Sequence, residues 1–350
     1  MVSAFWFVNN LLVDFMRQLP FLWCDFVVFA DSSICANMVP LNVVSYMKKG
    51  NCSMEKIGEL INHFRENKGM SQAELSEGIL SKAQLSKFER DLTKISVDKF
   101  LALLERLHVT FTEFGNALAI QERLYEQAIL EDITKAVINN NKDQAQLVKE
   151  RAEQHLKKHH GKYNQLTLIM VKAMICDMEK GTLPKADTKV LADYLFSVDG
   201  WTHFELLLFG NTMSALSLVT VNQLARELAA QINEAWAIHQ NFQLTINLLY
   251  NVVILNLSAK DLTTARLFLR VMKHSHVEDS MMAERYLIAL ADAFCDYCGE
   301  PTVEHENNVK RMIEIQKEIG STNFFVAFNN QAKMFINETK ISSNDSAGNV

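Results

Sequence analysis

Apolar residues recur at helical spacing along most of the chain. One face of a first amphipathic helix carries them at i, i+3, i+4 and i+7, namely Ile57, Leu60, Ile61 and Phe64. Later stripes are separated by polar breaks near residues 139–141, 159–161, 181–184, 199–200, 210–211, 259–261, 274–279 and 299–301. Intervals of about 20 to 40 residues are typical of stacked helical pairs. The pattern predicts an all-α chain.

Three capping boxes divide the segment after the first helix. In a capping box, a Ser or Thr side chain accepts from the amide three residues later, whose Glu or Gln side chain reaches back. The three pairs are Ser71 with Glu74, Ser81 with Gln84, and Thr110 with Glu113. Because the first two boxes are so close, they predict a short helix, a tight turn and a second short helix.

The second short helix has the pattern of a DNA-reading helix. With Leu85 and Phe88 inward, the residues predicted to face a major groove are Ser81, Lys82, Ala83, Gln84, Ser86, Lys87 and Arg90. Lys can donate to guanine, Gln can pair with adenine, and Ala can contact a thymine methyl group. The residues predicted to flank this helix and hold phosphates are Arg65, Lys68, Gln72 and Lys94.

The overall charge restricts this prediction to one surface. A formal net charge of -6 argues against a general polyanion binder. Charged residues on a short helix often form only a solvated face, but here the cations are segregated. The cations that we expect on one local surface are Lys82, Lys87, Arg90 and Lys94.

Composition supports the helical prediction and a reducing compartment. Only 12 Gly and 4 Pro occur in 350 residues, whereas loop-rich β folds need these residues in their turns. The 6 Cys lack the dense spacing of a secreted disulfide scaffold, so we expect a cytoplasmic protein.

Residues 1–53 differ from the rest of the chain. They are rich in aromatic residues and sustain no helical stripe, and acidic or basic residues interrupt every apolar run. Lys49-Gly50 can be encoded by a purine run like a ribosome-binding site, upstream of Met54. We expect a translated leader or disordered extension; a membrane-associated segment and a folded extension are the alternatives.

Two segments resemble a known family of regulators. The string SQAELSEGILSKAQLSKFERDLTKISVDKFLALLERL (71–107) resembles repressor-like helix-turn-helix domains, and more closely those of the Rgg/RopB/MutR regulators of Gram-positive bacteria. The segment LADYLFSVDGWTHFELLLFGN (191–211) also resembles this family. The resemblance implies a helix-turn-helix bundle followed by a tetratricopeptide-like helical-repeat superhelix that dimerises. Many members bind a secreted signalling peptide on the concave face, which implies quorum sensing.

The chain departs from the family at two positions. Val97 stands where some relatives carry a Cys implicated in an inter-subunit disulfide, so we predict no such crosslink. Ser214 stands where the branch that responds to short hydrophobic pheromones carries an Arg. A peptide ligand is still expected, but its class stays open.

Polar residues in the repeat region are the candidates for ligand contacts. An Asn amide offers a donor and an acceptor to a peptide backbone, and Asn247 and Asn251 lie one helical turn apart. Either Asn could instead cap or solvate its helix, and Arg226 could bind a peptide carboxylate or pair with a neighbouring Glu. The full candidate set is Asn211, Ser214, Arg226, Asn247, Tyr250 and Asn251.

No pattern in the chain indicates an enzyme. Phosphate-binding, nucleotide-binding, serine-hydrolase and zinc-protease motifs are absent from the sequence. Cys295 and Cys298 with His305 do not make the four ligands of a structural zinc site, although reversible oxidation is an alternative to ordinary buried cysteines. We expect no cofactor, no metal and no catalytic residue.

These features predict a dimeric transcription regulator. We expect residues 54–118 to bind double-stranded promoter DNA, residues 119–340 to bind a short signalling peptide and form a homodimer, and residues 341–350 to be a disordered tail. No membrane contact is expected for residues 54–350. The alternatives are a ligand-independent dimeric regulator and a protein-binding adaptor whose amino-terminal segment associates with a membrane.

Overall fold

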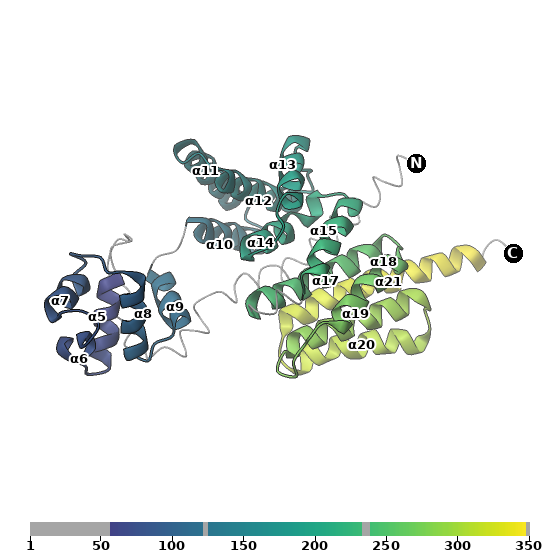
Figure 1. The fold of residues 1–350 in the computed structure, drawn as a ribbon. Coiled ribbons are helices and arrows are strands. Elements are labelled where there is room, and N and C mark those ends of the chain that lie inside the picture. The colour runs from purple at the N-terminus through teal and green to yellow at the C-terminus, as the bar shows by residue number, and fades with distance from the viewer. Residues whose placement is uncertain (1–56, 122–124, 233–238, 348–350) are drawn as a thin grey trace. The chain divides into compact units, whose positions relative to one another are not determined.

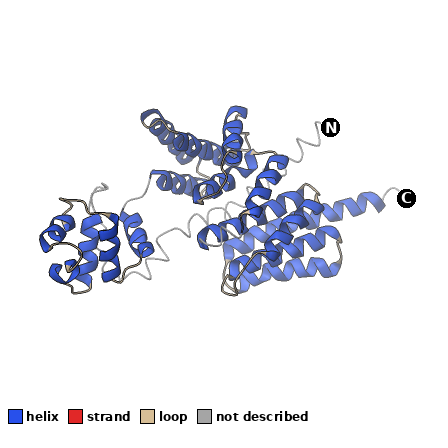
Figure 2. Cartoon of the chain, viewed as in Figure 1, coloured by secondary structure: helices blue, strands red, loops and turns tan. Residues whose placement is uncertain are grey.

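The structure is a computed structural model that describes residues 57–121, 125–232 and 239–347. The predicted leader and its alternatives fall on residues outside these ranges. Within them the chain forms α-helices, one short 3-10 helix and no strand (Figure 2), so the all-α prediction is confirmed. None of the described helices is long and apolar enough to cross a bilayer.

The described residues form two compact units, with the division after Ala128. The first unit contains α5 (Ile57–Asn67), α6 (Gln72–Ser76), α7 (Lys82–Glu89), α8 (Val97–Arg106) and α9 (Phe111–Gln121) (Figure 1). The helix α10 (Tyr125–Ile138) spans the division. The second unit continues with α11 (Lys142–Lys158), α12 (Lys162–Glu179), α13 (Lys185–Phe196), α14 (His203–Thr212), η1 (Met213–Ala215), α15 (Leu218–Ala230), α17 (His239–Ser258), α18 (Leu262–His274), α19 (Met282–Gly299), α20 (Val303–Glu318) and α21 (Thr322–Ala347).

Local capping and a small apolar core build the first unit. All three predicted capping boxes form, and in each the hydroxyl accepts from the expected amide at 3.1 or 3.2 Å. The apolar side of α7 packs inward, because Leu85 and Phe88 are buried with Leu60, Leu75 and Leu103. The caps fix where the short helices begin, and this core fixes which faces they expose.

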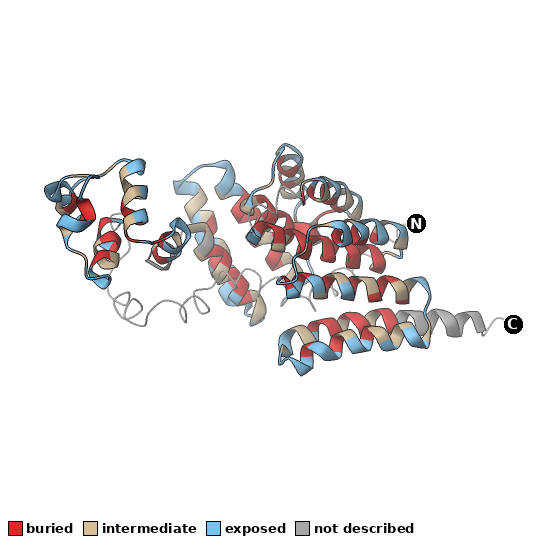
Figure 3. Cartoon of the chain, turned by 60° about the horizontal axis from the view of Figure 1, so that its bottom comes forward, coloured by how far each residue is buried: buried red, intermediate tan, exposed pale blue. Residues whose placement is uncertain are grey.

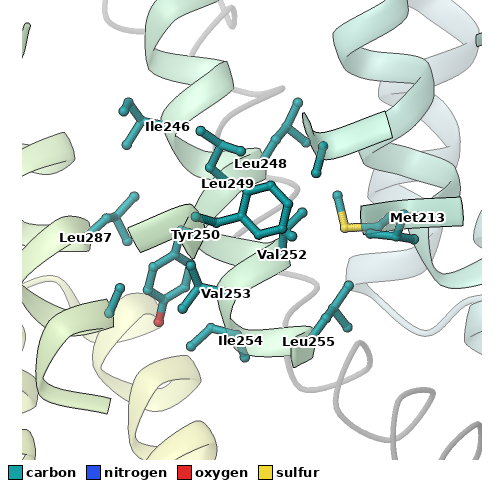
Figure 4. Close-up of a cluster of buried hydrophobic side chains, with 14 of the residues drawn as sticks. Met213, Ile246, Leu248, Leu249, Tyr250, Val252, Val253, Ile254, Leu255 and Leu287 are labelled. Carbon is teal, nitrogen blue, oxygen red and sulfur yellow. The ribbon is translucent and has the colours of Figure 1, made fainter. Parts of the chain in front are cut away.

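The second unit is a stack of antiparallel helical pairs around α17. α11 packs on α12, α17 on α18, and α19 on α20, while α12, α14 and α17 contact one another in succession. Every residue from Thr245 to Leu257 is buried, as expected for a helix enclosed on all sides (Figure 4). Figure 3 shows buried residues gathered where neighbouring helices face each other.

Two helices end later than the sequence predicts. α14 ends at Thr212, one residue past the break predicted near residues 210–211, and the Asn211 and Thr212 side chains donate to carbonyls of their own helix. α21 continues through residues 341–347, where the sequence predicts a disordered tail. No Gly or Pro occurs between residues 322 and 347 to end the helix.

Candidate functional site

The α6–turn–α7 segment presents a polar surface to solvent. Gly78 occupies the turn with a φ of +69°, a conformation that favours glycine. Five of the residues predicted to face a groove are exposed and lie in α7 or at its N-cap, namely Ser81, Lys82, Ala83, Gln84 and Lys87. Ser86 is half-buried, and Arg90 is exposed just after the helix, where its Nε donates to the Ser86 carbonyl at 3.0 Å.

The cations on this surface are not neutralised by the protein. Among the described residues, no ion pair involves Lys82, Lys87 or Lys94, and all three are exposed. Lys68 is also exposed and lies near Glu113. Hydrogen bonds from the Thr110 amide and hydroxyl lower the pKa of Glu113, and Lys68 adds a smaller attraction. The surface therefore keeps several ammonium groups available to an anion.

Arg65 is buried and bonded within the first unit. Its Nε donates to Glu89 Oε1 at 2.6 Å and its Nη1 donates to the Met70 carbonyl at 2.8 Å, and both charged side chains are buried. Hydrogen bonding to Glu89 raises the pKa of the guanidinium. These contacts favour a structural role over the predicted phosphate contact, since Arg65 joins α5 to α7.

Gln72 joins the same network. Its Nε2 donates to Glu89 Oε2 at 2.6 Å, which ties the first turn of α6 to the end of α7. The sequence analysis missed Glu89, because in the sequence of a helix of mixed polarity a carboxylate that is buried cannot be distinguished from one that is solvated. The half-buried Gln72 therefore orients the helices, whether or not its remaining atoms contact a phosphate.

A second arginine, also missed by the sequence, holds the carboxyl end of α6. Arg106, at the end of α8, donates from Nη1 to the carbonyls of Leu75 at 3.3 Å and Glu74 at 3.4 Å, and also to that of Glu77. The last carbonyls of a helix lack intrahelical donors and carry partial negative charge. Arg106 satisfies them and so fixes the turn that leads into α7.

The candidate ligand residues of the second unit are mostly buried amides. Asn211 and Asn247 each donate from Nδ2 to the carbonyl four residues earlier, at 2.8 and 2.6 Å. The Oδ1 atoms of Asn247 and Asn251 are buried and have no hydrogen-bond partner among the described residues. Leaving such an acceptor unsatisfied costs about 1–3 kcal/mol, so these two oxygens mark a place where a ligand or water would bind.

Three other candidates have different surroundings. The Ser214 hydroxyl donates to Asp177 Oδ2 at 2.6 Å, so it is already engaged. Arg226 is exposed on α15 near Asp261, whose pKa is lowered by hydrogen bonds from Thr264 and, less strongly, by Arg226. Tyr250 is fully buried and its hydroxyl donates to Gln331 Oε1 at 2.7 Å, so it supports another side chain, and its own contact with a ligand stays a prediction.

A buried carboxylate stabilises the start of α14, within the segment that carries the family resemblance. Glu205 accepts from the Tyr194 hydroxyl at 2.5 Å, from the Thr202 hydroxyl at 2.6 Å and from the Thr202 amide at 2.9 Å. Burial alone would raise the pKa of Glu205, but these hydrogen bonds together hold it below the usual value. The ionised carboxylate is therefore part of the fold.

The cysteine pair of α19 has no geometry for metal binding. Burial raises the pKa of the Cys295 thiol to about 12, so its thiolate is scarce at neutral pH. The described residues contain no group of three or more His, Cys, Asp or Glu side chains that could hold a metal ion.

Comparison with known proteins identifies relatives of both units. The family model of the carboxy-terminal domain of the HTH-type transcriptional regulator Rgg matches residues 148–330, and a general helix-turn-helix model matches residues 47–114. The first match covers just over half of the chain.

Several solved structures share the fold. The SHP pheromone receptor Rgg2 of Streptococcus dysgalactiae has a TM-score of 0.63 at 19% identity, over 79% of this chain and 99% of that one. A protein described as a transcriptional regulator of Listeria monocytogenes EGD-e has a TM-score of 0.72 at 17% identity, over 82% and 99%. PrgX in its complex with iCF10 has a TM-score of 0.64 at 17% identity, over 82% and 98%. At these identities the likeness establishes the fold alone.

Proposed function

Because the chain belongs to the Rgg family of HTH-type transcriptional regulators, we propose that α7 reads promoter DNA and that the second unit controls this binding in response to a short peptide. The family is one of transcriptional regulators and not of enzymes. The domain ranges proposed are residues 54–118 for DNA binding and 119–340 for peptide binding and dimerisation, in a cytoplasmic homodimer.

The exposed face of α7 is the observation that carries the DNA-binding proposal. Lys82 and Lys87 project from a helix whose opposite side is buried, and Lys94 and Arg90 lie beside its carboxyl end. Side chains on one face of a short, rigid helix can reach base edges, while neighbouring cations hold phosphates. We propose that Lys68, which is exposed, contacts a phosphate, and that Arg65, which is buried against Glu89, does not.

The peptide part is supported by buried amides and by the pheromones that similar proteins bind. Rgg2 is described as a pheromone receptor, and PrgX was solved with iCF10 and with cCF10. In this chain, Asn247 and Asn251 offer buried oxygens that lack partners among the described residues. Main-chain N–H groups of a peptide are suitable donors for them. Asn211, Ser214 and Arg226 are proposed to lie around this site.

A DNA-binding titration tests both parts. The chain is titrated onto labelled promoter DNA from beside its own gene, with and without a concentrated peptide fraction of spent culture medium. We expect specific binding, and a shift in affinity or complex mobility that needs the fraction and disappears after protease treatment of it. Binding that ignores the fraction would favour a ligand-independent regulator. Absence of specific binding at every salt concentration would contradict the DNA-binding proposal and favour the adaptor.

A further inference from the structure

Three buried amide atoms have no hydrogen-bond partner among the described residues and belong to one turn of α17 or to a side chain bonded to that turn. Two are Oδ1 of Asn247 and Oδ1 of Asn251, and the third is Nε2 of Gln331. Gln331 belongs to α21, far along the chain, but Tyr250 donates its hydroxyl to Gln331 Oε1 at 2.7 Å. Tyr250 follows Asn247 by three residues and directly precedes Asn251, so the hydrogen bond brings Gln331 beside the turn that carries both asparagines.

Tyr250 fixes how the Gln331 amide is oriented. Its ring is fully buried and lies against Phe328 of α21, with ring centroids 6.1 Å apart (Figure 4 shows Tyr250 within the surrounding apolar cluster). Because the Gln331 oxygen accepts from this immobilised hydroxyl, the amide nitrogen is left as the free donor. Both side chains are buried, so the nitrogen cannot compensate by turning to bulk water.

The donor and the two acceptors match the main chain of a peptide. Each peptide unit offers one N–H donor and one C=O acceptor, and an extended peptide presents both at regular intervals. We infer that Gln331 is a further ligand-binding residue, that it donates to a main-chain carbonyl of the peptide while Asn247 and Asn251 accept main-chain N–H groups, and that Tyr250 is the residue that positions it. The carboxy-terminal helix α21 thereby forms part of the ligand site. This inference rests on the proposed peptide-binding function.

Recognition of the main chain restricts the class of ligand. Three amides that bond to a peptide main chain recognise its extension and direction and not its side chains. The site therefore selects a short extended peptide by backbone contacts, while neighbouring apolar residues select its side chains. A peptide that cannot offer an unmodified backbone at this turn will bind weakly.

The test starts from a library of short synthetic peptides selected on the full chain, with affinities measured by fluorescence polarisation. Gln331→Leu is expected to weaken the selected peptide about tenfold or more, and Tyr250→Phe to weaken it less, because the amide remains but is no longer held. Gln316→Leu is the matched control, since Gln316 is a buried glutamine of α20 that bonds to Tyr286 in the same unit. It should leave the affinity unchanged.

Amide-to-ester replacements in the peptide then identify the carbonyl group that Gln331 contacts. Replacing one amide of the peptide by an ester makes the carbonyl oxygen of that peptide unit a weaker acceptor. At one ester position we expect a large loss of affinity for the wild type and no such loss for Gln331→Leu. If Gln331→Leu does not fold, Gln331→Glu preserves the volume and replaces the donor by an acceptor. Its affinity should fall by a similar factor.

The outcomes separate this inference from the function on which it rests. A wild-type chain that selects no peptide overturns the peptide part of the proposed function, and this inference with it. Peptides that bind the folded Gln331 variants as tightly as the wild type overturn this inference alone. Equal losses in the Gln316 control and in Gln331→Leu would also overturn it, because the effect would then come from general loosening of the unit.

Discussion

Single side chains decide which cations of the first unit can meet DNA. Arg65 and Lys87 both look like phosphate or base contacts in the sequence, yet the first is buried against a carboxylate and the second projects from α7 into solvent. A buried guanidinium with a carboxylate partner contributes to folding, whereas an exposed ammonium without one is available to a ligand. Substitution of Arg65 should therefore destabilise the fold, whereas substitution of Lys87 should weaken DNA binding.

Lys87→Ala is expected to weaken operator binding by about 1–3 kcal/mol and to relax base preference at one position of the site, because a base contact is lost. Competition titrations with single-base operator variants measure this. Lys185→Ala, an exposed lysine at the start of α13, is the control and should bind like the wild type. Unchanged operator affinity in Lys87→Ala would mean that another face of α7 enters the groove.

Arg65→Ala is expected to destabilise the first unit by about 3–5 kcal/mol, because it leaves Glu89 buried without its charged partner. Urea unfolding measures the change. Lys68→Ala is the control, because Lys68 is exposed just after α5. Its free energy of unfolding should lie within about 0.5 kcal/mol of the wild-type value. A stable Arg65→Ala chain that loses affinity for all DNA sequences alike would instead restore the phosphate contact predicted from the sequence.

At the scale of elements, local features were predictable and distant pairings were not. The capping boxes at Ser71, Ser81 and Thr110 form as predicted, because each depends only on residues three positions apart. The pairing of Arg65 with Glu89 spans 24 positions, and that of Tyr250 with Gln331 spans 81. Such contacts arise from how whole helices pack, which periodicity alone does not specify.

In the second unit, the family resemblance predicted more of the structure than the helical periodicity did. The segment 191–211 indicated the relatives, while the helical pattern alone indicated only a break near residues 210–211, where α14 ends at Thr212. The buried asparagines were singled out by chemistry, but their burial and the free donor of Gln331 needed the packed structure. The sequence could not show that Tyr250 bonds to Gln331 in the core, because an aromatic hydroxyl looks the same in a sequence whether it meets a ligand or the core.

The end of α6 should depend on Arg106. Arg106→Met removes the donor shared by three carbonyls, so we expect α6 and the turn at Gly78 to open more often than the rest of the unit. Hydrogen exchange should rise selectively in α6, with weaker discrimination between operator and random DNA. Arg106→Lys, which keeps the charge but loses the planar fork, should be intermediate. A uniform rise in exchange across α5 to α9 would contradict a local role.

The start of α14 should confer a pH dependence on the second unit. The pKa of Glu205 is lowered in the folded chain, so its contribution to stability is fully present above the unfolded value of about 4.5 and is lost as the pH falls through the lower folded value. Urea unfolding between pH 7 and pH 3 should show the advantage of the wild type over Glu205→Gln shrinking in this range. Glu150→Gln, an exposed site on α11, is the control. An advantage that stays constant with pH would contradict the ionised carboxylate.

At the scale of the whole molecule, the proposed function requires two chains. One helix-turn-helix unit presents a single short reading helix, and specific DNA interfaces commonly bury about 1,000–2,500 Å² of protein surface, more than a small module of this kind provides. A two-fold dimer doubles the contacts and reads two half-sites. We propose that the dimer forms through the second unit, as the resemblance to the Rgg regulators implies.

The spacing of the half-sites tests this dimer. Two reading helices related by a two-fold axis meet successive major grooves about 34–36 Å apart, which is one helical turn of DNA or a multiple of it. Inserting about five base pairs between the half-sites turns one of them to the opposite side of the duplex. We therefore expect this insertion to reduce binding to the level of a single half-site, and an insertion of about ten base pairs to restore part of it. Gel-shift titrations against the parent operator measure both, and equal affinity for all three DNAs would show that each chain binds alone.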